Sequence, residues 1–186
     1  MTVEDFKTIY WWEWGHRQFG RVIGLVWAVG LAAFLALRML PTGFFWPVTI
    51  PGLLGGVQAV IGMWMVESGV APGSELVSVA PYRLAIHLGL AFLILALLLW
   101  PAWRLTREEW KLLQARRRRP GGAMLASGLV VGLAFVQIAL GALVAGNDAG
   151  RGYVDWPLMN GHVLPPEAWE LQPLWRNFVW TDALTQ

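Results

Sequence analysis

The sequence predicts an all-α, polytopic integral membrane protein, and its composition is the first reason. Of its 186 residues, 56% are hydrophobic and only 14% are charged, whereas soluble domains average roughly 25% charged residues. The mean hydropathy is +0.51. A soluble domain of this length could not bury so much apolar surface, but a lipid bilayer accommodates it.

Four apolar stretches are the second reason, because each has the roughly 20 residues that a membrane-spanning helix needs. We expect spans at about 19–40, 44–66, 83–103 and 122–145. Prolines and glycines interrupt the second stretch, which neighbouring helices tolerate by satisfying the freed backbone groups. The sequence therefore predicts a single membrane domain over residues 1–186, folded as a four-helix bundle.

The charges of the loops predict the orientation of these spans. Arg38 and the segment 103–120 together carry eight basic residues and two acids, whereas the loops on the opposite side carry six basic residues and ten acids. Seven of those eight basic residues lie in one short loop, which should be cytoplasmic. Both chain ends and the loop 147–180 are then expected on the periplasmic side of a bacterial membrane.

Part of the loop 147–180 has a periodic apolar pattern. Leu171, Leu174, Trp175, Phe178 and Val179 recur at helical spacing. The pattern fits a short helix lying in the membrane interface. An ordinary tryptophan-rich loop is the alternative.

Some kinds of chemistry are excluded or disfavoured by the composition. The chain has no cysteine, which excludes disulfides, iron–sulfur clusters and thiol nucleophiles. The basic run at 116–119 is interpreted as an orientation signal with secondary contact to anionic lipid. We expect no nucleic-acid partner.

Two of the three histidines lie in or beside predicted spans, at His16 and His87. The first and third spans run in the same direction, which places both imidazoles near the outer edge of the bilayer. Two neutral imidazoles at matched depth on separate helices can ligate one metal, most commonly haem iron. The alternative, in which each histidine only forms hydrogen bonds at the interface, is about equally supported. His162 lies in a loop and is expected to be solvated.

Side chains near these histidines extend the hypothesis. Glu13 precedes His16 by three residues, so a continuous helix would bring its carboxyl to the same face, where it could transfer protons. The alternative is an acid at a helix start that interacts with the helix dipole. Arg17 and Arg83 could pair with haem propionates or extend to lipid headgroups. Gly20 and Gly24 could leave room for a planar ligand or allow close helix packing.

Four tracts in this order resemble the haem A synthase family. They are FKTIYWWEWGHRQFGRVIG (Phe6–Gly24), GMWMVESG (Gly62–Gly69), PYRLAIHLGLA (Pro81–Ala91) and GALVAGNDAGRGYVDWPLMNGHVLPP (Gly141–Pro166). The absence of cysteine makes the chain look most like the proteobacterial and mitochondrial form. That family has eight spans in two similar four-helix halves, and this chain would hold the second to the fifth span. The resemblance therefore implies a truncated or fragmentary chain.

The resemblance also implies a reaction, the oxidation of a methyl group of haem O to the formyl group of haem A, for terminal oxidase biogenesis. His16 and His87 would be the axial ligands of the haem O iron, and Glu13 the acid that assists oxidation. A haem b is expected in the missing half. Haem O synthase and cytochrome oxidase assembly factors are the implied protein partners.

A membrane cytochrome b with two histidine ligands, which transfers electrons to or from a quinone, is the alternative function. A transporter or assembly subunit with incidental histidines is a third. The expected location is the bacterial inner membrane, or the mitochondrial inner membrane if the source is eukaryotic.

Overall fold

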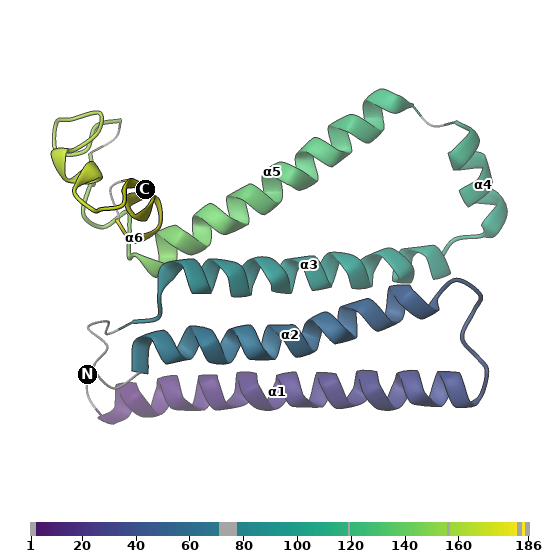
Figure 1. The fold of residues 1–186 in the computed structure, drawn as a ribbon. Helices are drawn as coiled ribbons and strands as arrows, with labels where there is room; N and C mark the ends of the chain where they lie inside the picture. The colour runs from purple at the N-terminus through teal and green to yellow at the C-terminus, as the bar shows by residue number, and fades with distance from the viewer. Residues whose placement is uncertain (1–2, 71–77, 119, 156, 182–183, 185–186) are drawn as a thin grey trace. The chain divides into compact units, whose positions relative to one another are not determined.

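A computed structural model describes residues 3–70, 78–118, 120–155, 157–181 and 184. Helices dominate the described chain (Figure 1). The long ones are α1 (Val3–Ala36), α2 (Phe45–Val70), α3 (Pro81–Leu105) and α5 (Gly121–Gly146), and α4 (Glu109–Arg117) is short. The C-terminal segment contains two 3-10 turns, η1 (Pro166–Trp169) and η2 (Leu174–Arg176), followed by α6 (Asn177–Trp180).

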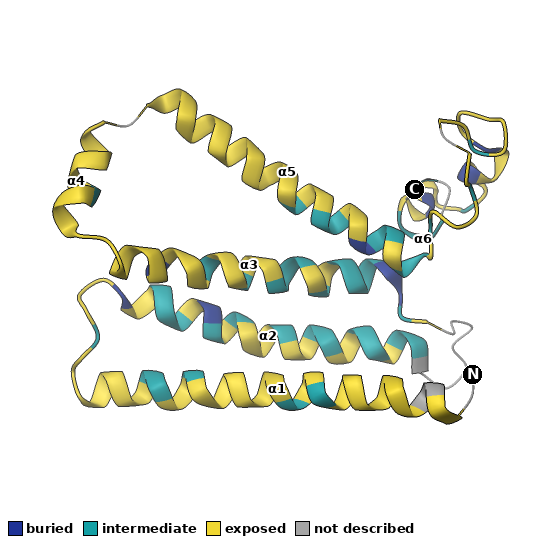
Figure 2. Cartoon of the chain, turned by 180° about the vertical axis from the view of Figure 1, so that it is seen from behind, coloured by how far each residue is buried: buried dark blue, intermediate teal, exposed yellow. Residues whose placement is uncertain are grey.

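Four helices are long and apolar enough to cross a membrane, namely Lys7–Ala36, Phe45–Gly69, Pro81–Leu105 and Gly121–Gly146. Most side chains of α1 and α5 are exposed (Figure 2), and many of these are large and apolar. Such surfaces are stable against lipid and costly in water. The prediction of an all-helical, multi-pass membrane protein is thus confirmed.

The helix α1 differs from the expected first span at both ends. It begins at Val3 instead of near residue 19, so the aromatic and charged N-terminal run is helical as well. It ends at Ala36 because Arg38 adopts a left-handed backbone conformation with φ of 54°. The N–H of Met39 then donates to the carbonyl of Phe34 at 2.9 Å, which satisfies a carbonyl that the helix end leaves open.

The chain divides into two compact units, and each is described separately. The first unit contains Met1–Ala59 and Ile94–Thr106, and the second contains Val60–Leu93 and Arg107–Gln186. The helices α2 and α3 each contribute residues to both units.

In the first unit, Trp27 joins α1 to α2. Its indole Nε1–H donates to the backbone carbonyl of Val48 at 2.9 Å. Its ring occupies the space that a Cβ atom on Gly52 would fill, 1.8 Å from the ring atom Cε2. Further along this unit, the Arg104 guanidinium lies 5.1 Å from the centre of the Phe44 ring, within range of a cation–π attraction.

In the second unit, the C-terminal part of α2 and the N-terminal part of α3 are fastened together. The hydroxyl of Ser68 accepts a hydrogen bond from the Ala80 backbone N–H at 2.8 Å. At the end of α5, a Cβ on Gly146 would lie only 2.8 Å from the Cα of Pro81. Glycine therefore permits the close approach of α5 to the start of α3.

The periodic stretch within 165–180 is partly helical, because η2 and α6 follow one another directly and form a short helical run from Leu174 to Trp180. Leu171 lies outside this run, since proline at position 173 has no N–H to donate within a helix and restricts the residue before it. The fully buried Asn177 connects Leu171 to the run. Its amide accepts from the N–H of Leu171 at 2.9 Å and donates to the carbonyls of Leu171 and Leu174.

The basic loop contains α4, a nine-residue helix that the hydropathy pattern does not predict. Its last turn carries Arg116 and Arg117, which suits the negative end of a helix dipole. Of the basic run predicted to set the orientation, Arg119 lies outside the described residues.

Candidate functional site

His16 lies well inside α1, on the same stripe of that helix as Trp27, the residue that contacts α2 in the first unit. The helix is continuous from His16 to Trp27, and eleven residues make close to three turns. The two side chains therefore leave α1 in nearly the same direction, and the Trp27 ring meets α2 at Val48. His16 itself is exposed.

Gly20 and Gly24 lie below His16 on neighbouring positions of the same helix. A Cβ atom added to either glycine would meet no described atom within 4 Å. Neither glycine is therefore in close contact with another described part of the chain, and both sequence interpretations stay open.

Glu13 shares the helix α1 with His16, one turn earlier. It lies far from the helix start at Val3, and dipole effects fade beyond the first turn, so the interpretation of Glu13 as a helix-start acid is wrong. Its carboxylate instead pairs with the Arg17 guanidinium, Oε2 to Nη2, at 2.6 Å. Both side chains are about half exposed, and such surface pairs hold their partners weakly.

A shallow depression of about 280 Å³ lies along the Glu13 side of α1. Its walls come from residues spaced three and four apart, which share one face of the helix. The lining residues are Tyr10, Glu13, Trp14, Arg17, Gln18 and Arg21. The depression thus combines one carboxylate and two guanidinium groups with aromatic rings.

His87 lies in the second unit, on α3, with its imidazole against α2. A Cβ on Gly62 would lie 2.9 Å from the ring atom Cε1, 3.5 Å from Nδ1 and 3.7 Å from Nε2. The nitrogen-bearing edge of the ring therefore faces the α2 backbone at a residue that has no side chain. The imidazole is only partly exposed.

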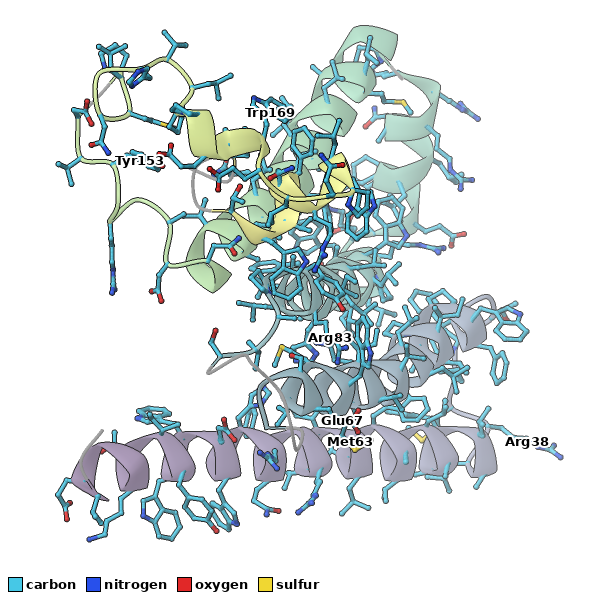
Figure 3. The ribbon with its side chains drawn as sticks, turned by 60° about the vertical axis from the view of Figure 1, so that its left-hand side comes forward. Arg38, Met63, Glu67, Arg83, Tyr153 and Trp169 are labelled. Carbon is cyan, nitrogen blue, oxygen red and sulfur yellow. The ribbon has the colours of Figure 1, made fainter. Side chains whose placement is uncertain are left out.

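Arg83 lies one turn before His87 on the same face of α3, and it is held against α2 (Figure 3). Its guanidinium carbon is 4.3 Å from the centre of the Trp64 ring. Its Nη1 donates to the Trp64 carbonyl, and its Nε donates to the Tyr82 hydroxyl at 3.1 Å. The remaining amino group, Nη2, has no hydrogen-bond partner in the part of the chain that the structure describes.

The aromatic neighbours of Arg83 continue towards the C-terminal segment. The Tyr82 ring lies 5.8 Å from Trp64 and 5.7 Å from Trp180, edge to face in both pairs. The Asn147 side chain donates to the carbonyl of Val179 at 3.2 Å. The C-terminal segment at Val179 and Trp180 is therefore attached to α3, the helix that carries His87 and Arg83, and to the C-cap residue of α5.

His162 is exposed in a loop, as expected. Two residues with positive φ, Asn160 at 51° and Gly161 at 82°, form the tight turn before it. Their backbone N–H groups donate to the Asp155 carboxylate at 2.9 and 3.0 Å. These two hydrogen bonds lower the pKa of Asp155 below its ordinary value, because they favour the ionised form. This loop is thus an ordered polar turn.

The sequence-predicted site residues divide between the two units. Glu13, His16 and Arg17 belong to the first unit, and Arg83 and His87 belong to the second. No cluster of three or more histidine, aspartate or glutamate side chains suited to a metal ion is found within the described ranges. The two imidazoles therefore belong to different units of the chain.

Sequence reasoning missed the α2 residues that surround His87 and Arg83. Gly62 and Trp64 lie in a tract, GMWMVESG, that was recognised as a whole without a role for either residue. The sequence did hold one signal for a helix packed at this place. Arg83 and His87 are four residues apart, so both lie on one face of α3, and polar side chains on one face of a spanning helix are expected to contact a neighbouring helix.

Comparison with known proteins identifies the family. A family model described as "Cytochrome oxidase assembly protein" matches residues 1–186. The chain belongs to the cytochrome oxidase assembly protein family. Relatives named "Heme A synthase" are 57% identical in Ruegeria pomeroyi, 55% in Dinoroseobacter shibae and 52% in Roseobacter denitrificans, each over the whole of this chain. The resemblance seen in the four sequence tracts is confirmed.

The chain spans about half the length of these relatives, 48–49% in the three named. No solved structure matches this member of the family. The assignment to the cytochrome oxidase assembly protein family therefore comes from the sequence.

Proposed function

We propose that this chain is part of a haem A synthase, which oxidises a methyl group of haem O to the formyl group of haem A. The single observation that carries the proposal is the identity of 52–57% to relatives with that name over the whole chain. The product would serve the assembly of a terminal oxidase, in keeping with the family description.

The residues present fit a bound haem substrate. A porphyrin supplies four nitrogen ligands, so the protein needs to add only axial ligands, for which imidazole is well suited. The His87 ring occupies space at Gly62 that a Cβ atom would otherwise fill. No described atom lies within 4 Å of a Cβ added to Gly20 or Gly24, one and two turns after His16. We infer that His16 and His87 would hold haem O through its iron.

Two arginines are placed to receive the haem propionates. Among the described residues, no partner is found for the Nη2 amino group of Arg83, and the other nitrogens fix the direction of the guanidinium. Arg17 is engaged with Glu13 in an exposed pair, which exchanges partners at little cost. In this proposal a propionate draws Arg17 away and leaves the Glu13 carboxylate free to act.

Glu13 is the proposed proton acceptor. Oxidation of a methyl group to a formyl group takes up an oxygen atom from water, passes electrons to an external acceptor and leaves protons to be removed at the edge of the macrocycle. Glu13, one turn from His16 on α1, would be the carboxylate that receives a proton. It can accept a proton and stabilise positive charge as it develops. The bound haem supplies the redox-active iron, and the protein supplies binding, orientation and proton transfer.

Pigment analysis of the full-length protein tests the function. The protein is purified from membranes that contain haem O, and its extracted haem is separated by chromatography. Haem A among the extracted pigments supports the proposal. Haem that is recovered without chemical change would instead support the cytochrome b alternative, in which the same two histidines ligate a haem that transfers electrons.

We also propose an orientation in the inner membrane, with the basic loop around α4 in the cytoplasm and the loop 147–180 in the periplasm. The support is the concentration of basic residues in one short loop. Single cysteines at Gln114 and Gly150 can be labelled from the periplasm in this cysteine-free chain. We expect labelling at Gly150 alone, and labelling at Gln114 would overturn the orientation. Haem O synthase and oxidase assembly factors are the proposed neighbours.

A further inference from the structure

We propose that Gly62 is a positioning residue for His87, because its missing side chain lets the imidazole seat against α2 in the direction needed to ligate haem. The inference rests on the proposed function in one respect, that His87 is an axial ligand. It extends that function by assigning a role to a residue on α2, a helix that carries no proposed ligand.

The geometry of the contact is the first argument. A Cβ added to Gly62 would lie 2.9 Å from Cε1 of His87, a separation that Cβ atoms in proteins do not adopt, and 3.5 and 3.7 Å from the two ring nitrogens. The clash falls on the ring edge that holds both potential ligand atoms. An alanine at this position must therefore move the imidazole or separate the helices.

The helices resist separation, because neighbouring contacts hold them. Arg83, one turn from His87, is bonded to the Trp64 carbonyl and stacked on the Trp64 ring at 4.3 Å. Ser68 and Ala80 are joined by a hydrogen bond of 2.8 Å. With α2 and α3 fastened on this side, the imidazole itself is the group that a new methyl displaces.

The consequence of displacement is chemical. An axial imidazole ligates iron through one nitrogen lone pair, so its distance and tilt set the strength of the bond and the spin state of the iron. Groups that orient a metal-bound histidine typically change metal affinity by about 10- to 100-fold when they are altered. We expect Gly62→Ala to weaken haem binding in this half of the protein by about tenfold or more.

Gly89 provides the matched control. It lies on α3, two residues from His87, and a Cβ there would meet no described atom within 4 Å. Gly89→Ala makes the same chemical change in a helix interior, with the same gain in helix propensity, but without a contact to the imidazole. We expect Gly89→Ala to bind haem as the unaltered protein does.

The experiment measures the absorbance and electron paramagnetic resonance spectra of the full-length protein titrated with haem. Spectra of His87→Ala are subtracted, which removes any haem held elsewhere. We expect a low-spin, two-imidazole signal in the unaltered protein and in Gly89→Ala. In Gly62→Ala the signal should shift towards high spin, and the affinity should fall about tenfold or more.

The outcomes separate this inference from the proposed function. If the unaltered protein and His87→Ala give the same spectra, His87 is not a ligand, and the proposed ligation and the role of Gly62 both fail, whereas pigment analysis still decides the haem A synthase proposal. If that difference is present but Gly62→Ala keeps both the signal and the affinity, ligation stands and the role of Gly62 is overturned.

A double variant distinguishes displacement of the imidazole from a general disturbance of helix packing. With the imidazole removed, Gly62→Ala has nothing to displace, so Gly62→Ala combined with His87→Ala should accumulate in membranes and melt as His87→Ala alone does. If the double variant is lost from membranes while His87→Ala is retained, Gly62 acts on helix packing instead, and the inference is overturned.

Discussion

The surroundings of His16 and His87 are built differently, although the two histidines are proposed to do the same work. His87 rests on Gly62 beside an arginine that is stacked, hydrogen-bonded and attached to a second helix. His16 is exposed on α1 beside glycines with open surroundings, and its neighbouring ion pair is local to one helix. The proposed ligand on α3 thus packs against a second helix, whereas the proposed ligand on α1 is exposed.

Replacing each histidine by alanine is the strongest test of this comparison. Loss of either ligand should reduce haem affinity by more than about 100-fold, beyond the effect of outer-shell changes. His87→Ala should cost more than His16→Ala by about 2- to 10-fold, because an exposed side chain loses about 0.5–1.5 kcal/mol of freedom on binding. Haem titration followed by absorbance measures both.

His162→Ala is the control for that experiment, because His162 is exposed in the loop of the Asp155 turn. Its affinity should match that of the unaltered protein. Equal tolerance of alanine at all three positions would remove the ligand hypothesis, and equal losses at His16 and His87 would remove the contrast in preorganisation.

Glu13→Gln tests whether the surroundings of His16 contribute to the chemical step rather than to haem binding. The substitution keeps size and hydrogen bonding but removes charge and basicity. We expect formation of haem A to fall by about 100- to 10,000-fold, the usual contribution of a positioned acid–base group, while haem affinity stays within a few-fold. Chromatography of extracted pigments measures the product, and normal haem A levels in this variant would rule out the role of Glu13.

Arg83→Gln and Arg17→Gln give the smallest expected effects, on the stability of the haem-free protein in detergent. Arg83→Gln removes a cation–π contact and charged hydrogen bonds between helices, worth about 1–3 kcal/mol. Arg17→Gln removes one exposed pair within a helix, worth about 0.3–0.5 kcal/mol. Thermal unfolding should show a lower melting temperature for Arg83→Gln than for Arg17→Gln, and the reverse order would contradict the contrast.

Much of the fold was predictable because membrane-spanning helices can be recognised in a sequence by their length and apolar composition. Helix ends were harder to predict. Helix α1 begins at Val3, in a run of aromatic and charged residues that hydropathy does not mark as helical, and Pro173 interrupts a stretch that has helical periodicity. For the site, spacing along one helix placed Glu13 beside His16 and Arg83 beside His87. Contacts between helices, such as Trp64 with Arg83, have no such local signal.

The Ser68–Ala80 hydrogen bond has a consequence for how this protein tolerates change. It joins the end of α2 to the start of α3 at 2.8 Å, and the neighbouring Gly69 would place a Cβ only 3.1 Å from the Ser78 backbone. The α2–α3 junction is therefore held by a bond from a backbone N–H to a side-chain hydroxyl, which makes it sensitive to the identity of a single residue, Ser68.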